Sequence, residues 1–325
     1  MDDGARPAAR LRENVARAVI GKGSAVELVL VALICEGHVL LEDVPGVGKT
    51  LLGKAVARSL GLSFGRIQFT PDLLPSDITG SRVFNQRTGE FEFRPGPLFA
   101  NVILADEINR ATPRTQSALL EAMEERQVTA DGVTMPLPRP FLVLATQNSI
   151  ELEGTFPLPE AQLDRFLLRL ALGYPSAAEE EEILLRVGDA DPLSTLEPVL
   201  DADDLDRSRE LASQVHMAGA VRSYLVAVVR ATRGHSALLL GASPRASLAL
   251  YRATRALAGI RGRGFVRPDD IKELAAAVLG HRVILGAEAR LRAHDPAALV
   301  REIVESVLVP VEDEPAPQAV LRRHA

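Results

Sequence analysis

The sequence predicts an α/β protein, in which a parallel sheet is covered by helices on both faces and is followed by a helical domain. Three observations lead to this prediction. Five short apolar segments alternate with helical patterns, which is typical of parallel strands joined by crossover helices. A glycine-bearing loop links the first of these segments to a helix. After Gly173-Tyr174-Pro175 the strand pattern fades and helical periodicity takes over.

The first apolar segment, Val39-Leu40-Leu41, leads into a candidate phosphate-binding loop. Strand, glycine-rich loop, Lys-Thr and helix, in this order, form the context in which such loops bind nucleotide phosphates. Gly46 and Gly48 let backbone N–H groups turn inward, and the following helix adds its positive dipole end. Lys49 would contact the β- and γ-phosphates, and the Thr50 hydroxyl would ligate Mg²⁺. The candidate nucleotide-binding residues are Asp43, Val44, Pro45, Gly46, Val47, Gly48, Lys49, Thr50 and Leu51.

Asp43 departs from the generic pattern of phosphate loops, which has glycine at this position. The alternative interpretation is a glycine-rich turn between a strand and a helix that carries a surface lysine. The acidic pair Asp106-Glu107 farther along the chain favours the nucleotide site, because a phosphate loop and an acidic strand end occur together in nucleotide hydrolases.

The segments around the loop complete the first part of the predicted sheet. Residues 5–18 and 24–36 have helical patterns, and residues 62–69 form a strand pattern. Residues 79–98 place a turn sequence between two β-like flanks, which predicts a hairpin inserted into the α/β frame. The next apolar strand, residues 101–105, ends in two adjacent carboxylates, Asp106 and Glu107.

Asp106 and Glu107 lie where the carboxyl end of a buried parallel strand is expected. Asp106 would hold Mg²⁺, usually through water, and Glu107 would polarise the attacking water. A strand that merely ends in two solvated carboxylates is the alternative, and the neighbouring phosphate loop argues against it.

The remaining elements of the α/β part follow in order. Thr112-Pro113 caps a predicted helix that ends near Glu125, and Asp131-Gly132 marks the turn of a second hairpin within residues 128–140. Residues 141–148 form a strand pattern that ends at Asn148, a residue that could hydrogen-bond the γ-phosphate or the attacking water. An ordinary turn residue at the end of a strand is the alternative. The last strand is expected within residues 167–172.

The second half of the chain is dominated by helical patterns, and one basic residue there breaks a local rule. Arg245 follows the N-cap pair Ser243-Pro244, so its charge opposes the helix dipole, and a bound phosphate would remove this conflict. An exposed arginine tolerated at small cost is the alternative. The expected divisions are residues 1–173 for the nucleotide-binding domain with two hairpin inserts, 174–310 for the helical lid, and 311–325 for a disordered tail.

Charge and composition limit the class of protein. The 325 residues contain 47% hydrophobic and 25% charged residues and carry a net charge of −6, as in soluble globular proteins. We expect no signal peptide, no membrane insertion and a cytoplasmic location. Nucleic acid is not favoured as a partner by the acidic balance, although no acidic residue occurs from Leu211 to Arg267, where nine arginines lie. These arginines could meet nucleotide, nucleic acid or an acidic neighbour, and the acidic neighbour is the most economical partner because the same chain supplies the acidic residues. Ordinary solvated faces are the alternative.

Taken together, these motifs resemble those of the MoxR family of AAA+ ATPases, and the resemblance extends from about Val19 to Leu308. Residues 41–50 are similar to the Walker A motif of that family, and residues 105–110 to its Walker B motif. Residues 145–148 resemble its sensor 1 strand, with Asn148 as the sensor. Residues 158–166 resemble the segment that ends in the arginine finger, which suggests Arg165. Ser243-Pro244-Arg245 resembles sensor 2, which suggests Arg245.

The resemblance implies an AAA+ P-loop domain, a small helical lid, and a ring, usually hexameric, with ATP and Mg²⁺ at the subunit interfaces. Members are regarded as chaperone-like machines that activate or remodel protein complexes, often with von Willebrand factor A-domain partners. The ATPase subunit of a metal chelatase and a DNA-acting AAA+ motor remain alternatives, and so does a scaffold that binds ATP with negligible hydrolysis. The sequence identifies neither the client protein nor the partner.

Overall fold

The computed structural model describes residues 5–130, 132–147, 154–186 and 191–309. Its centre is a five-stranded sheet in the order β2-β5-β8-β1-β9. All four strand pairs are parallel, so the predicted parallel sheet is confirmed. The strands are β1 (Val39–Glu42), β2 (Phe64–Gln68), β5 (Val102–Asp106), β8 (Leu142–Gln147) and β9 (Leu168–Leu170).

Helices cover both faces of this sheet because successive side chains of a strand point to opposite sides. In β1, Val39 and Leu41 belong to one hydrophobic cluster and Leu40 to another. The same alternation occurs in β5 and β8, whose side chains are buried on both faces. The first cluster includes side chains of α1 (Ala5–Ala16), α2 (Gly23–Ile34) and α3 (Lys49–Ser59), and the second includes those of α4 (Pro75–Thr79) and α5 (Pro113–Glu125).

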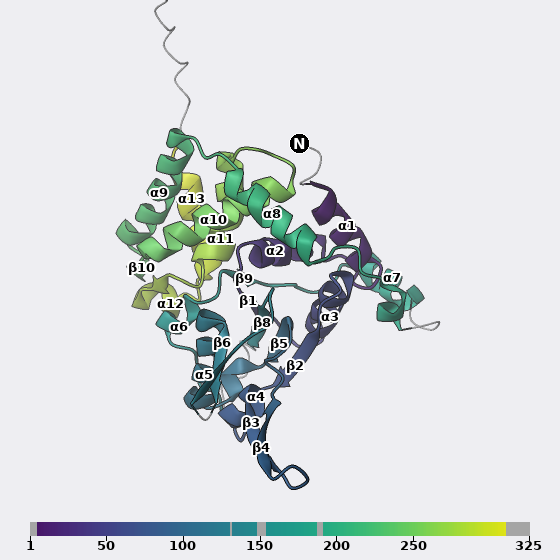
Figure 1. Cartoon of the computed structure of the whole chain (residues 1–325). Helices are drawn as coiled ribbons and strands as arrows, with labels where there is room; N and C mark the ends of the chain where they lie inside the picture. The colour runs from purple at the N-terminus through teal and green to yellow at the C-terminus, as the bar shows by residue number, and fades with distance from the viewer. Residues whose placement is uncertain (1–4, 131, 148–153, 187–190, 310–325) are drawn as a thin grey trace, which may run out of the picture.

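Both predicted hairpins are present. The first pairs β3 (Gly80–Asn85) with β4 (Glu90–Pro95) and projects from the body of the protein (Figure 1). The second pairs β6 (Gln127–Ala130) with β7 (Val133–Pro136), although Asp131 of its turn lies outside the described residues. Thr112 is the N-cap residue of α5 as expected, with Pro113 in the first turn.

The second half is mostly helical, as predicted, but it also contains a short antiparallel pair of strands, β10 (Leu238–Leu240) and β11 (Ile284–Leu285). Periodicity did not reveal such short strands, because a segment of two or three residues carries almost no alternation. The helices are α7 (Ala177–Arg186), α8 (Ala202–Gln214), α9 (Gly219–Gly234), α10 (Pro244–Ile260), α11 (Pro268–Leu279), α12 (Ala287–Leu291) and α13 (Pro296–Ser306).

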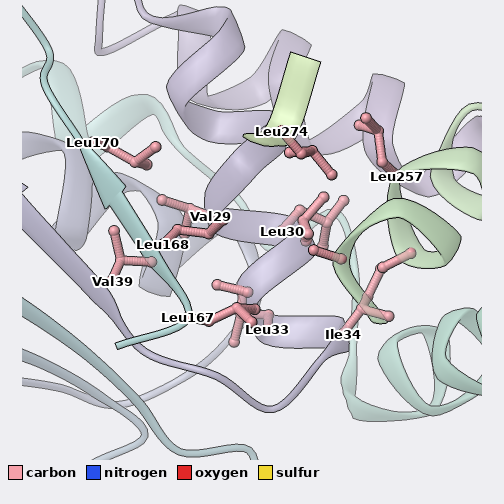
Figure 2. Packing of buried hydrophobic residues seen from close by; sticks show 14 of the residues in the cluster. Val29, Leu30, Leu33, Ile34, Val39, Leu167, Leu168, Leu170, Leu257 and Leu274 are labelled. Atoms are coloured by element: carbon pink, nitrogen blue, oxygen red, sulfur yellow. The ribbon is translucent and has the colours of Figure 1, made fainter. Parts of the chain in front are cut away.

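The helical part and the sheet share one hydrophobic core, and α2 lies between them. Val29, Leu30, Leu33 and Ile34 of α2 pack in the same cluster as residues of β1, β9, α10 and α11 (Figure 2). This position explains why α2 is apolar on nearly all sides, since a helix enclosed by neighbours needs no polar face. Helix α7 lies on the opposite side of the protein from β10 and α12 (Figure 1). No helix in the described part of the chain is long and apolar enough to cross a bilayer.

Candidate active site

The predicted phosphate loop connects β1 to the N-terminus of α3. Gly46 and Gly48 have φ angles of 86° and 89°, in the left-handed region that favours glycine. A side chain at either position would meet no other atom within 4 Å, so backbone conformation rather than space requires glycine. Lys49 Nζ donates a hydrogen bond to the Asp43 carbonyl at 3.0 Å, which folds the lysine over its own loop.

A cavity of about 400 Å³ opens between this loop and the carboxyl ends of β5 and β8. Oxygen donors of the Thr50 hydroxyl and the Asp106 carboxylate meet there, and these are the ligands that Mg²⁺ prefers. The described residues contain no cluster of three or more His, Cys, Asp or Glu side chains that could enclose a metal. The two oxygen donors would suit a Mg²⁺ ion, which usually keeps several waters in protein sites. The lining residues are Pro45, Gly46, Gly48, Lys49, Thr50, Leu51, Arg66, Asp106, Glu107 and Thr146.

Asp106 is held by two neighbouring strands. Thr146 Oγ1 of β8 donates to Asp106 Oδ1 at 2.6 Å, and the Arg66 guanidinium of β2 contacts Asp106 Oδ2 at 2.7 Å. The Asp106 side chain is only 15% exposed, so the arginine charge offsets part of the cost of burying its carboxylate. Arg66 itself is half exposed and lines the same cavity.

Glu107 adopts an unusual backbone conformation for a residue with a side chain, with a φ of 57°. Its N–H group donates to Thr146 Oγ1 at 2.8 Å, and a short helix, η1 (Ile108–Arg110), begins after it. Gln68 Nε2 donates to Glu107 Oε2 at 2.9 Å, and Arg110 Nε lies 3.0 Å from the same oxygen. The strain at such positions is commonly found at active sites, where the surrounding structure fixes a side chain for its task.

A second, more apolar cavity of about 450 Å³ adjoins the first, with Gly46, Gly48 and Leu51 as shared walls. Its other walls come from the segment between α1 and α2, from α7 and from the segments on either side of α7. It has the size and apolar lining expected for the planar purine or pyrimidine base of a nucleotide. The residues that line it are Ala18, Val19, Ile20, Lys22, Gly46, Val47, Gly48, Leu51, Pro175, Ile183, Arg186 and Pro192.

The loop residues predicted to bind nucleotide divide into two groups. Those from Pro45 to Leu51 line one or both cavities, whereas Asp43 and Val44 line neither. The Asp43 carboxylate instead accepts hydrogen bonds from the backbone N–H groups of Leu172 and Gly173, beyond the last strand. Asn148, the predicted sensor, lies outside the described residues.

The two predicted arginines also lie away from both cavities. Arg165 follows α6 (Glu160–Leu163) and pairs with Glu124 of α5 at 2.9 Å. Arg245, in the first turn of α10, is 67% exposed and lies 3.5 Å from Asp164, the residue next to Arg165. The structure thus brings the two arginines to the same region of the protein. Elements near them, α6 and β10, are on the side opposite α7 (Figure 1).

Sequence reasoning missed several residues of the site. Arg66 and Gln68 lie two positions apart in β2, so they share one face of the sheet, and there they contact Asp106 and Glu107. Period-2 polarity in an edge strand does not by itself indicate function. Thr146 lies within residues 145–148, which resemble the sensor 1 strand, but the resemblance gives a role only to Asn148. The base cavity draws on segments that are distant in sequence, and no local signal connects them.

The fold and the site define a class of protein. A phosphate loop at the carboxyl edge of a parallel sheet in this strand order, an acidic strand end beside it, a base cavity and a helical part together form the nucleotide-binding unit of AAA+ ATPases.

Comparisons with known proteins agree with this class and show which family within it the chain belongs to. Residues 38–168 match the model of the ATPase family associated with various cellular activities (AAA), and residues 230–303 match the AAA lid domain. The chain is 52% identical to the uncharacterized protein YeaC of Bacillus subtilis over 92% of this chain and 94% of that protein. It is 47% identical to Chaperone MoxR1 of Mycobacterium tuberculosis, over 91% and 81% of the two chains.

Its identity to Protein MoxR of Methylorubrum extorquens is 34%, over 93% of this chain and 95% of that one. A crystal structure described as a candidate ATPase from Cytophaga hutchinsonii superposes with a TM-score of 0.88 at 39% identity, over 95% and 98% of the two chains. The chain belongs to the MoxR family of AAA+ ATPases, and it is an ATPase. The family expected from the motifs is thereby confirmed.

Proposed function

We propose that this protein hydrolyses Mg·ATP at the interfaces of a ring, usually a hexamer in such ATPases, and uses the cycle to remodel or activate protein complexes. The observation that carries the proposal is the pair of adjoining cavities joined at the phosphate loop. One is apolar and suits a base, and the other collects Lys49, Thr50, Asp106 and Glu107 and suits the phosphates.

In this proposal each residue of the phosphate cavity has one task. Lys49 leaves the Asp43 carbonyl to bind the β- and γ-phosphates, and the loop N–H groups bind phosphate oxygens. Thr50 and Asp106 would hold Mg²⁺, which when bound neutralises phosphate charge. Glu107 accepts a proton from the attacking water. Asn148, outside the described residues, would orient that water or the γ-phosphate.

Arg165 and Arg245 are proposed to act on the nucleotide of a neighbouring subunit. Two features support this role: neither arginine lines the two candidate nucleotide cavities of its own chain, and Arg245 lies 3.5 Å from Asp164, the residue next to Arg165. A head-to-tail ring would bring this side of one subunit to the nucleotide of the next. There the arginines would stabilise the negative charge that spreads over the transferred phosphoryl group.

The remodelling role is supported by the relatives, one of which is named a chaperone. By the same resemblance we propose a von Willebrand factor A-domain protein as a partner. Pulling down partners with an ATP-bound Glu107→Gln variant would identify the client protein and test the von Willebrand factor A-domain partner.

The first experiment tests the roles of Glu107 and Lys49. Glu107→Gln should bind Mg·ATP with unchanged affinity but lose turnover, because the amide keeps the shape and removes the base. Lys49→Ala should lose binding, because a charge-assisted contact to phosphate disappears. Lys54→Ala is the matched control, since Lys54 lies five positions farther along α3, is exposed and lines neither cavity. Equal ATP affinity of Lys49→Ala and the unmodified protein would refute the assignment of the phosphate loop.

The second experiment tests the action of Arg165 between subunits. Arg165→Ala and Glu107→Gln, each inactive alone, are mixed in equal amounts under conditions where subunits exchange. An Arg165→Ala subunit keeps its Glu107, and a Glu107→Gln neighbour supplies Arg165, so roughly a quarter of the interfaces become complete in a ring of this kind. Recovery of ATPase activity supports the proposal. Confirmed exchange without recovery, or full activity of Arg165→Ala alone, contradicts it.

A further inference from the structure

The chain leaves the sheet through a short linker, residues 172–175, that connects β9 to α7. This linker also forms part of the base cavity, since Pro175 lines it together with Ile183 of α7. Gly173 has a φ of 65°, so the linker turns at a residue in the left-handed region. The linker is therefore both a wall of the candidate nucleotide site and the covalent connection from the sheet to the helical part.

From one side the linker is held by Asp43 of the phosphate loop. Asp43 Oδ2 accepts hydrogen bonds from the backbone N–H groups of Leu172 and of Gly173, the latter at 2.8 Å. Its other oxygen, Oδ1, accepts from the N–H of Val44 at 3.0 Å, which fixes the carboxylate within its own loop. Glycine, the usual residue at this position of a phosphate loop, could make none of these bonds.

From the other side the linker is held by Lys22, which precedes α2. Lys22 Nζ donates to the carbonyls of Leu172 at 2.8 Å and of Gly173 at 3.0 Å. Lys22 is only 8% exposed, and a buried ammonium is tolerated only where acceptors replace water. Two opposite charges thus hold the N–H groups and the carbonyls of the same two residues, and both charges belong to segments next to the candidate nucleotide cavities.

Asp43 also contacts the lysine of the phosphate loop, because its carbonyl accepts the hydrogen bond from Lys49 Nζ. A phosphate oxygen attracts the ammonium group more strongly than a backbone carbonyl does. Binding of a phosphate would therefore take Lys49 away from the residue whose side chain holds the linker. Lys22, in turn, lines the cavity for the base.

We propose that Asp43 and Lys22 are positioning residues that transmit the state of the nucleotide cavities to the linker, and through it to α7. The inference rests on the proposed function, since it takes ATP as the molecule that fills the two cavities. The competing explanation is that the two residues hold the linker in one conformation whether or not nucleotide is bound. Only a change in the linker on nucleotide binding distinguishes the proposal from this explanation.

The test measures hydrogen exchange of the backbone amides of residues 172–174 with and without Mg²⁺ and a non-hydrolysable ATP analogue. In the unmodified protein the analogue should change the exchange rate at least fivefold. In Asp43→Gly, which restores the usual phosphate-loop residue, and in Lys22→Met, the amides should exchange faster and no longer respond. In Asp43→Gly the dissociation constant for ATP should stay within threefold of the unmodified protein, because Asp43 lines neither cavity, while kcat falls at least tenfold in both variants.

Two control variants lose the same charges as the Asp43 and Lys22 variants, but at exposed positions. Asp203→Asn and Lys54→Met remove exposed charges of the same kinds and should leave both exchange and kcat unchanged. Asp43→Asn keeps the size of the side chain and one carbonyl oxygen, so it should give intermediate exchange even if Asp43→Gly folds poorly.

The coupling is overturned if the unmodified protein binds the analogue without any change in exchange at residues 172–174. It is also overturned if Asp43→Asn and Lys22→Met fold and respond to the analogue as the unmodified protein does, with kcat within twofold. Failure of the unmodified protein to bind ATP would instead refute the proposed function, so the two failures are distinguishable.

Discussion

Replacement of Arg282 by methionine should weaken the attachment of the helical part to the sheet. Arg282 follows α11, and its side chain is only 4% exposed. Its Nε donates to Asp164 Oδ1 at 2.6 Å, and its other nitrogens donate to the carbonyls of Asp164, Phe166, Leu167 and Val278. Burial lowers the pKa of Arg282 below its ordinary value, and the pairing with Asp164 opposes this effect.

The expected loss follows from these contacts. Removing one partner of a buried ion pair costs about 3–5 kcal/mol, because the other charge and its polar neighbours are left without partners. Asp164 is 20% exposed and keeps Arg245 at 3.5 Å, so we expect a value near the lower end, about 3 kcal/mol. Arg282→Lys should recover only part of it, because an ammonium cannot reproduce the planar fork of the guanidinium.

Urea unfolding followed by circular dichroism measures this loss as a change in the free energy of unfolding. Arg301→Met is the control, since Arg301 is 61% exposed and lies 3.6 Å from Asp295, and such a pair contributes less than about 1 kcal/mol. Because Asp164 precedes Arg165, Arg282→Met should also lower the ATPase rate at denaturant concentrations where the protein is still folded. A loss of stability below about 1 kcal/mol would refute the reasoning.

Two further predictions concern acid stability and nucleic acid. Burial lowers the pKa of His38 to about 4, and the charge of Arg126 acts in the same direction, whereas the hydrogen bond from its Nε2 to the Met123 carbonyl opposes the shift. Its Nδ1 accepts from the Val143 N–H. Since the unfolded state binds the proton first, this stability is complete above pH 6.5 and falls by about 3 kcal/mol as the pH is lowered to 4. Unfolding of His38→Gln over this range should show a correspondingly smaller pH dependence, and identical dependence would contradict the assignment. DNA or RNA should bind weakly and leave the ATPase rate unchanged, and a several-fold stimulation would contradict this. Several lid arginines already have protein partners, namely Arg233, Arg255, Arg261 and Arg263.

The features that the sequence predicted correctly are those carried by contiguous residues. Residues 46–50 encode the phosphate loop because two glycines and the start of a helix determine its backbone conformation locally. The strands were recognised by short apolar runs, and both hairpins by their turn residues. Asp106 and Glu107 could be placed at the sheet edge because every parallel strand ends at the same edge.

The tertiary structure alone decided which distant residues meet. Asp43 reads as a departure from a loop pattern until its carboxylate is seen to hold Leu172 and Gly173, about 130 positions away. Arg66 meets Asp106 only because β2 pairs with β5. Such contacts depend on how helices and strands pack, and local propensity or periodicity in a single sequence carries no information about which partners packing will bring together.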